Sequence, residues 1–261
     1  MAKPKTKGKK AGDDSLVEAG PFKPIGENQE TYHRLIDTCT VTFGVGPAGV
    51  GKTMVPAAYA ANKLVSDGGY RLIVARPLVT AGKGVGHLPG TLEDKTAPYL
   101  KPVMGILSRQ LGPVMLKHCL DKGRITGVPI EFMLGETYDN TMILVDEAQN
   151  TDCEQMELIL TRIGQDSKVV LTGDYKRQKF IHCKSGLQDA EERLKHIKGV
   201  GIVHFNIDDC QRHDIVKDIM YAYYEEGHAG KPAGTPKEKV VAHTPERGRA
   251  DEGFPMQEPE T

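Results

Sequence analysis

The sequence lacks long apolar runs and closely spaced cysteines. No stretch of its 261 residues approaches the roughly 18 consecutive apolar side chains of a membrane-spanning helix. The Lys-rich start lacks the apolar segment of a secretory signal. Five scattered cysteines form no C-x-x-C pair, a pattern that favours free thiols over disulfides or a zinc site. We therefore expect a cytoplasmic protein with no membrane partner.

The chain also lacks an excess of charge of one sign. Its 34 basic and 35 acidic residues leave a net charge of −1, which neither indicates nor excludes a nucleic-acid partner. Residues 1–20 begin with a lysine-rich segment, and residues 228–261 mix glycine, proline and both charges. Such composition buries too little apolar surface to offset chain entropy. We expect disordered tails at 1–20 and 228–261 around one domain at 21–227, the basic arm serving either nucleic-acid contact or solubility.

Glycine is concentrated at one informative place. Residues 46–53 read GPAGVGKT, which fits G-x-x-x-x-G-K-[ST], between an apolar run at 41–45 and a helical pattern at 54–65. In that context backbone N–H groups and the helix dipole converge on one anionic pocket. Lys52 would reach the β- and γ-phosphates, and the Thr53 hydroxyl would hold Mg²⁺. The expected nucleotide-binding residues are Gly46, Pro47, Ala48, Gly49, Val50, Gly51, Lys52, Thr53 and Met54.

A second motif consists of four apolar residues followed by two acids. Residues 142–147 read MILVDE, typical of a buried parallel strand that delivers carboxylates at its C-terminal edge. Asp146 would hold Mg²⁺ through its water shell, and Glu147 would orient or deprotonate the attacking water. An isolated acid pair is commonly a solvated strand end. Beside a phosphate loop, Glu147 predicts hydrolysis rather than binding alone.

Periodic segments alternate between strand and helix patterns. This alternation predicts an α/β fold, a parallel sheet with helices on both faces. Residues 151–154 read TDCE and fit a capping box that starts the helix after Asn150. The predicted strands are 41–45, 71–75, 142–146, 168–172 and 201–205. The predicted helices are 28–37, 53–66, 94–110, 112–121, 151–163, 186–197 and 212–225.

Several short sequence blocks are spread in one order across the predicted domain. They are Gly26-Glu27-Asn28-Gln29 with Tyr32, residues 42–49, Ala75-Arg76-Pro77, Leu88-Pro89-Gly90 with Lys95 and Pro98-Tyr99-Leu100, residues 146–150, Leu160-Thr161-Arg162 with Ser167-Lys168, Thr172-Gly173-Asp174, Ser185-Gly186-Leu187, and Arg212-His213. Together they resemble the PhoH family, single-domain ATPases related to the motor core of superfamily 1 helicases. The resemblance covers the whole predicted domain.

The resemblance implies a single RecA-like P-loop domain in which strand 168–172 lies between the phosphate-loop strand and the acid strand. It also implies ATP as nucleotide, Mg²⁺ as metal, a hexameric ring and, in some members, RNA unwinding. Gln29 matches a glutamine that reads the adenine edge, the alternative being a solvated helix residue. Asp174 matches an aspartate that senses the γ-phosphate, the alternative being a turn.

Two positions depart from the family pattern. The family usually has glutamine three residues after the sensing aspartate, where this chain has Arg177, and Gln178 comes one residue late. Either the loop shifts so that Gln178 takes the role, or γ-phosphate sensing differs. Leu134 and Glu136 stand where the family commonly has two arginines. This departure weakens the expectation of helicase activity more than that of ATPase activity.

Two arginines are candidates for an arginine finger, a guanidinium that one subunit inserts into the ATP site of its neighbour. Arg162 and Arg212 each fit either this role or an intramolecular ion pair. Arg76 is expected to be structural or to face nucleic acid rather than to be catalytic. The glycine-rich segment 76–101, with Lys83, His87 and Lys95, fits either a nucleic-acid-lined pore or an oligomerisation loop.

The sequence therefore predicts a Mg²⁺-dependent ATPase that forms a ring and acts on RNA or another single-stranded nucleic acid. Lys52, Glu147, Asp174, Gln178, Arg162 and Arg212 are its predicted catalytic residues, and Thr53 and Asp146 its predicted metal ligands. Two alternatives remain open: a P-loop phosphotransferase (kinase), and a non-enzymatic scaffold gated by ATP.

Overall fold

Six parallel strands form the centre of the molecule. The computed structural model describes residues 22–77, 92–178 and 184–225. The strand order is β3-β2-β4-β5-β1-β6, so β5 lies between β1 and β4 as the resemblance implies. The five predicted strands are confirmed to within a residue. The bounds are β1 Val41–Val45, β2 Arg71–Arg76, β3 Ile125–Pro129, β4 Thr141–Val145, β5 Lys168–Gly173 and β6 Val200–His204.

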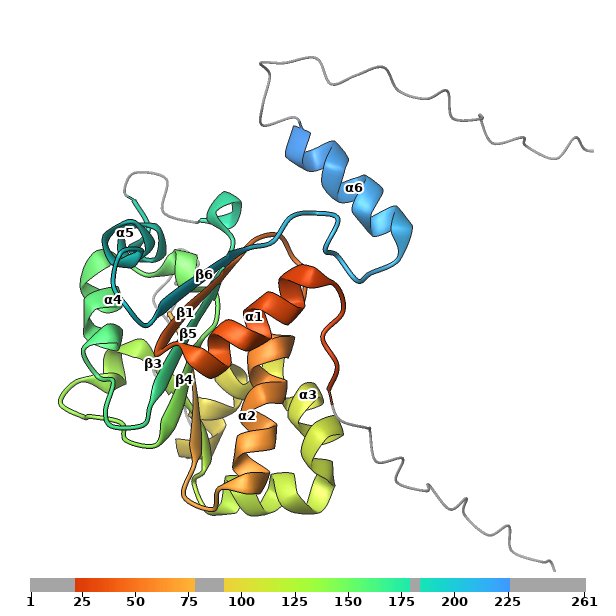
Figure 1. Ribbon diagram of the computed structural model, residues 1–261. Helices are drawn as coiled ribbons and strands as arrows, with labels where there is room; N and C mark the ends of the chain where they lie inside the picture. The colour runs from red at the N-terminus through yellow and green to blue at the C-terminus, as the bar shows by residue number, and fades with distance from the viewer. Residues whose placement is uncertain (1–21, 78–91, 179–183, 226–261) are drawn as a thin grey trace, which may run out of the picture. The chain divides into compact units, whose positions relative to one another are not determined.

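Helices cover both faces of this sheet, as predicted (Figure 1). One face packs against α1, α2 and α3, and the other against α4 and α5. The helices are α1 Glu27–Thr38, α2 Met54–Ser66, α3 Leu92–Asp121, α4 Cys153–Leu160, α5 Gly186–Leu194 and α6 Asp214–Glu225, with short 3₁₀ turns η1 Ile130–Met133, η2 Ala148–Asn150 and η3 Tyr175–Arg177. Within the described ranges, no helix has both the length and the apolar character needed to cross a bilayer.

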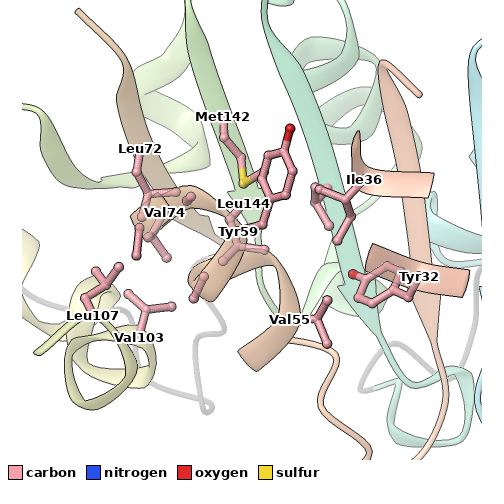
Figure 2. Packing of buried hydrophobic residues seen from close by; sticks show 14 of the residues in the cluster. Tyr32, Ile36, Val55, Tyr59, Leu72, Val74, Val103, Leu107, Met142 and Leu144 are labelled. Carbon is pink, nitrogen blue, oxygen red and sulfur yellow. The ribbon is translucent and has the colours of Figure 1, made fainter. Parts of the chain in front are cut away.

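Alternation along β4 shows how the sheet builds two cores. Met142 and Leu144 belong to the cluster that α2 and α3 cover, whereas Ile143 and Val145 belong to the opposite cluster. Figure 2 shows the first cluster, in which Met142 and Leu144 lie among side chains from neighbouring strands and helices. All four side chains are fully buried, which contributes about 1.5–3 kcal/mol for each. These cores fix the position of the carboxyl end of β4, where the acids follow.

The sequence did not predict β3. Its segment ITGVP contains one glycine and one proline, residues that are uncommon inside strands. It lies at the edge of the sheet and pairs only with β2 among the described strands, a position that tolerates such residues. The two helices predicted at 94–110 and 112–121 run on as α3, but Gly112 interrupts them with φ 69° and ψ 163°.

The start of α4 corrects a predicted boundary. The capping residue is Asp152, not Thr151: its side chain accepts a hydrogen bond from the Gln155 N–H at 2.7 Å, and Gln155 Oε1 accepts from the Asp152 N–H at 3.2 Å. Asp is at least as good a cap as Thr, so the capping box forms one residue later. Thr151 is instead buried and donates its hydroxyl to the Ala148 carbonyl oxygen.

The chain divides into two units, Met1–Ala222 and Tyr223–Thr261, and the sheet belongs to the first. The boundaries predicted at residues 20 and 228 stay predictions. The segment 76–101 was expected to be either a nucleic-acid-lined pore or an oligomerisation loop. Its residues Lys83 and His87 lie outside the described residues, as does the side chain of Lys95.

Candidate nucleotide-binding site

The glycine loop joins β1 to α2 at the carboxyl edge of the sheet. Gly49 and Gly51 have φ of +86° and +94°, a region that residues with a Cβ rarely adopt. The Gly46 N–H donates to the Gly173 carbonyl oxygen at 3.0 Å, which fastens the loop to the end of β5. The Lys52 ammonium donates to the carbonyl oxygens of Gly46 and Pro47, both at 2.6 Å. Lys52 therefore curls over its own loop.

Gln29 of α1 lies directly beneath this loop and is 1% exposed. Its Nε2 donates to the Val50 carbonyl oxygen at 3.0 Å, and its Oε1 accepts from the Ile25 N–H at 3.0 Å. A Cβ on Gly51 would lie 2.6 Å from that Nε2. The Gln29 amide thus supports the backbone of the loop, and its contact with adenine stays a prediction.

Asp146 directly follows β4 and lies against the loop, with 7% of the residue exposed. Its Oδ1 accepts hydrogen bonds from the hydroxyls of Thr53 at 3.1 Å and Thr172 at 3.0 Å. Its Oδ2 lies 3.5 Å from Arg76 Nε. The Asp146 carboxylate is therefore contacted from three directions: by a hydroxyl from the loop after β1, by a hydroxyl of β5 and by a guanidinium of β2.

Glu147 is held in an uncommon backbone conformation next to Asp146. Its φ of 58° and ψ of 36° lie in the left-handed region, which a non-glycine residue keeps only when its surroundings enforce it. Its Oε2 accepts from Gln149 Nε2 at 2.7 Å, and its Oε1 lies 3.8 Å from Arg76 Nη2. The carboxylate is thereby oriented while its side chain remains 46% exposed to solvent.

Asp174 completes the acidic side of the site at the end of β5. Its N–H donates to Gln149 Oε1 at 3.2 Å, so the buried Gln149 amide connects Asp174 to Glu147. Its carboxylate accepts from the Lys176 N–H at 3.1 Å and lies 3.5 Å from Arg177 Nε. The backbone of Asp174 and the carboxylate of Glu147 therefore share one hydrogen-bond partner, Gln149.

These groups enclose a cavity of about 370 Å³. Its walls include the glycine loop, the three carboxylates, Pro102 and Ile106 of α3, and four basic side chains: Lys52, Arg76, Arg177 and Arg212. A second cavity of about 450 Å³ shares Arg76, Glu147 and Arg177 with the first, and Pro77, Pro98 and Tyr99 line its other side. The two cavities therefore meet at Glu147.

The electrostatics of the first cavity favour an anionic ligand. Burial lowers the pKa of Lys52, an effect that nearby Asp174, Glu147 and Asp146 partly offset and that the positive charge of Arg177 increases. A polyphosphate beside Lys52 would supply negative charge and restore its protonated form. Lys52 is therefore stabilised in its protonated form by an anion bound at the end of the cavity that the glycine loop lines.

The structure separates the two predicted arginine fingers. Arg212 lies against the glycine loop of its own chain: the Gln211 N–H donates to the Gly49 carbonyl oxygen at 3.1 Å, and a Cβ on Gly49 would stand 2.9 Å from Arg212 Nε. Arg162 lies at the amino ends of the strands, opposite the carboxyl ends where the cavity is. There its carbonyl oxygen accepts a hydrogen bond from the Tyr138 N–H, just before β4. Arg162 is not among the residues that line the cavity of its own chain.

Sequence reasoning missed several side chains that build the site. The contacts of Arg76 with both acids were not foreseen, although the residue was expected to be structural or to face nucleic acid. Thr172 binds Asp146, Gln149 connects two acids, and the Tyr32 hydroxyl donates to the Lys52 carbonyl oxygen at 3.3 Å. Arg177 rather than Gln178 lines the cavities. Their positions in the sequence could have identified most of them, because they lie at or just after the carboxyl ends of parallel strands, where ligands bind in such sheets.

The oxygen atoms beside Asp146 fit a magnesium ion. Mg²⁺ is usually held by one or two protein oxygens, with phosphates and water as its other ligands. Thr53 supplies a hydroxyl and Asp146 a carboxylate, already in contact with each other. Among the described residues no group of three metal-binding side chains occurs, so a metal here would depend on phosphate and water for most of its ligands.

The parallel sheet, the glycine loop after β1 and the strand inserted between β1 and β4 define a RecA-like P-loop domain. A family model described as PhoH-like protein matches residues 21–224, and the chain belongs to the PhoH family. A PhoH-like protein from Synechocystis sp. is 37% identical over 85% of this chain and 66% of its own length. One from Mycobacterium leprae is 40% identical over 83% and 63%, and Protein PhoH from Escherichia coli is 37% identical over 79% and 59%.

The chain therefore covers less than two thirds of the length of these three relatives. Among solved structures, the large terminase from a thermophilic bacteriophage aligns with a TM-score of 0.44 and 12% identity. That alignment covers 80% of this chain and 51% of the terminase chain.

Proposed function

We propose that this chain is a Mg²⁺-dependent ATP hydrolase. The observation that carries the proposal is the contact of Thr53, in the glycine loop, with Asp146, the first acid after β4. It brings the phosphate-binding loop and the acid pair together at one cavity of about 370 Å³. A loop that only turned the chain would have no need of a carboxylate pair aimed at it.

In the binding step, the backbone N–H groups of the loop and the start of α2 receive the phosphate oxygens. Lys52 exchanges its bonds to the Gly46 and Pro47 carbonyl oxygens for the β- and γ-phosphates. Arg212 lies beside Gly49 and adds positive charge at the same end of the cavity. Thr53 and Asp146 would hold Mg²⁺, which neutralises phosphate charge when bound.

In the chemical step, Glu147 orients a water molecule and accepts its proton. The water oxygen forms a bond to the γ-phosphorus, the bond from that phosphorus to the β–γ bridging oxygen breaks, and ADP leaves. Gln149 and Arg76 hold the Glu147 carboxylate for this task, at 2.7 Å and 3.8 Å. Asp174, whose N–H donates to Gln149, would sense the γ-phosphate.

The partners of the reaction are also part of the proposal. Arg162 lies at the amino ends of the strands, away from the cavity of its own chain. This position suits an arginine finger that acts on the ATP of a neighbouring copy in a hexameric ring. The second cavity, with Arg76, Arg177 and Tyr99, suits a single-stranded nucleic acid such as RNA. Its charge would make such binding dependent on salt.

The test is release of phosphate from ATP by the purified chain, with and without Mg²⁺, single-stranded RNA or single-stranded DNA, at two salt concentrations. We expect Mg²⁺-dependent free phosphate and stimulation by one polymer that weakens at the higher salt. Phosphorylation of an acceptor without free phosphate would identify a phosphotransferase. Nucleotide binding without turnover under every condition would identify an ATP-gated scaffold.

A further inference from the structure

Arg177 stands where the two cavities meet. It ends η3, directly after β5 and Asp174, and lines both the cavity of about 370 Å³ and that of about 450 Å³. Only Arg76 and Glu147 share this position among the lining residues. Glu147 is the residue proposed to orient the attacking water, and Arg177 lines the same two cavities as Glu147.

The four basic side chains of the first cavity are not equivalent. Lys52 and Arg212 contact the glycine loop, and Arg76 is paired with both acids of the strand end. Arg177 is paired with Asp174 through Nε at 3.5 Å, and its side chain is 58% exposed. Such a side chain can turn toward an added anion without breaking buried packing.

Arg177 lines the nucleotide cavity together with Lys52, Arg76 and Arg212. These four cations outnumber the three carboxylates of the cavity, Asp146, Glu147 and Asp174, and the excess of positive charge favours a ligand with several negative charges. In the proposed function, the γ-phosphate of ATP brings such charge to this end of the cavity.

We propose that Arg177 stabilises, within its own chain, the negative charge that develops on the γ-phosphoryl group during hydrolysis. The inference rests on the proposed ATPase function and adds a residue to it. Arg177 donates N–H hydrogens to γ-phosphoryl oxygens and exchanges no proton, because the proton of the attacking water goes to Glu147. The chain thereby supplies in cis the charge that many P-loop enzymes receive from an arginine of a neighbour.

The first experiment compares Arg177→Gln with Arg193→Gln. Arg193 also contacts an aspartate through Nε, at 2.6 Å from Asp189, but it lies on α5 and is 74% exposed. We expect Arg177→Gln to lower kcat by about 10³-fold, the scale of an arginine finger. Affinity for ADP, which lacks the γ-phosphate, stays unchanged, and Arg193→Gln behaves as the unmodified chain.

Arg177→Lys provides a second variant at the same position. Lysine keeps the positive charge but loses the forked geometry of the guanidinium. We expect its kcat to lie between those of Arg177→Gln and the unmodified chain. Equal kcat for Arg177→Gln and Arg193→Gln, with an active unmodified chain, would overturn the inference while leaving the ATPase proposal intact. No turnover by the unmodified chain would overturn both.

A mixing experiment separates action in cis from action in trans. Equal amounts of Glu147→Gln and Arg177→Gln chains are combined, and phosphate release is measured. If Arg177 acts on its own chain, no mixed assembly contains a complete site and activity stays at the level of the separate variants. Recovery of activity would show that a neighbour supplies the arginine. The matched mixture of Glu147→Gln with Arg162→Gln is expected to recover activity if Arg162 serves a neighbouring copy.

Discussion

The Thr53 hydroxyl donates a hydrogen bond to Asp146 at 3.1 Å, although 93 residues separate them along the chain. Thr53 precedes α2 at the end of the glycine loop, and Asp146 follows β4, two strands away from β1 in the sheet. The bond exists because both strands are parallel and end at the same edge. It joins the two predicted metal ligands to each other.

Thr53→Val removes this hydroxyl and keeps the shape of the side chain. We expect the Mg²⁺ concentration for half-maximal turnover to rise about tenfold or more, the usual scale for disturbed metal sites. A Mg²⁺ titration of phosphate release measures the change. Thr161→Val, which alters an exposed threonine at the end of α4, is the control and should leave the titration unchanged. An unchanged titration for both variants would contradict the metal assignment.

Arg76→Gln should shift the same titration in the opposite direction. Arg76 contacts Asp146 and Glu147 and thereby competes with a cation for the acids. Partly exposed ion pairs contribute about 0.5–1 kcal/mol, so Mg²⁺ affinity should increase about two- to fivefold. At saturating Mg²⁺, kcat should nevertheless fall, because Glu147 loses a contact that orients it. A weaker Mg²⁺ affinity in this variant would show that Arg76 does not compete with the metal.

ATP binding should take up protons at alkaline pH. Burial lowers the pKa of Lys52 in the free protein, and bound phosphates raise it again. Affinity is therefore constant below the free-state pKa and falls as pH rises through it, with proton uptake between the two pKa values. Calorimetry in buffers of different ionisation enthalpy measures this uptake. Lys52→Arg should lose it because arginine remains charged, and the same uptake in Lys52→Arg would exclude Lys52 as its source.

Gly51→Ala tests the support of the loop by α1. Its φ of +94° strains any residue with a Cβ, and that Cβ would lie 2.6 Å from Gln29 Nε2. We expect the free energy of unfolding to fall by about 1–3 kcal/mol, as measured by urea denaturation. Gly68→Ala is the matched control, because nothing lies within 4 Å of its added Cβ. Equal stability of the two variants would mean that the loop adapts without cost.

Local patterns were sufficient to predict the framework of this site. The motif around Lys52, the apolar run before Asp146 and the alternation of elements predicted five of the six described strands. They also predicted that the glycine loop and the acids meet at one edge of the sheet. Each of these signals lies within a few consecutive residues. The strand β3 was not predicted because its composition is unlike that of most strands, and its place in the sheet is evident only from its pairing with β2.

The contacts among site residues could not be read from local patterns. Arg76 reaches the acids because β2 lies next to β4, and Thr172 reaches Asp146 because β5 lies on the other side. That order is a property of the whole sheet and no short segment encodes it. The same holds for Arg212, which reaches Gly49 only because the chain returns to the glycine loop after β6.

The most direct test of the ATPase account is the behaviour of Glu147→Gln. The substitution keeps the shape of the side chain and removes the group that accepts the proton of the attacking water. We predict unchanged affinity for ATP, measured by calorimetry, together with a fall in the single-turnover rate of phosphate release by about 10²-fold or more. A variant that binds ATP and hydrolyses it at the rate of the unmodified chain would contradict the account.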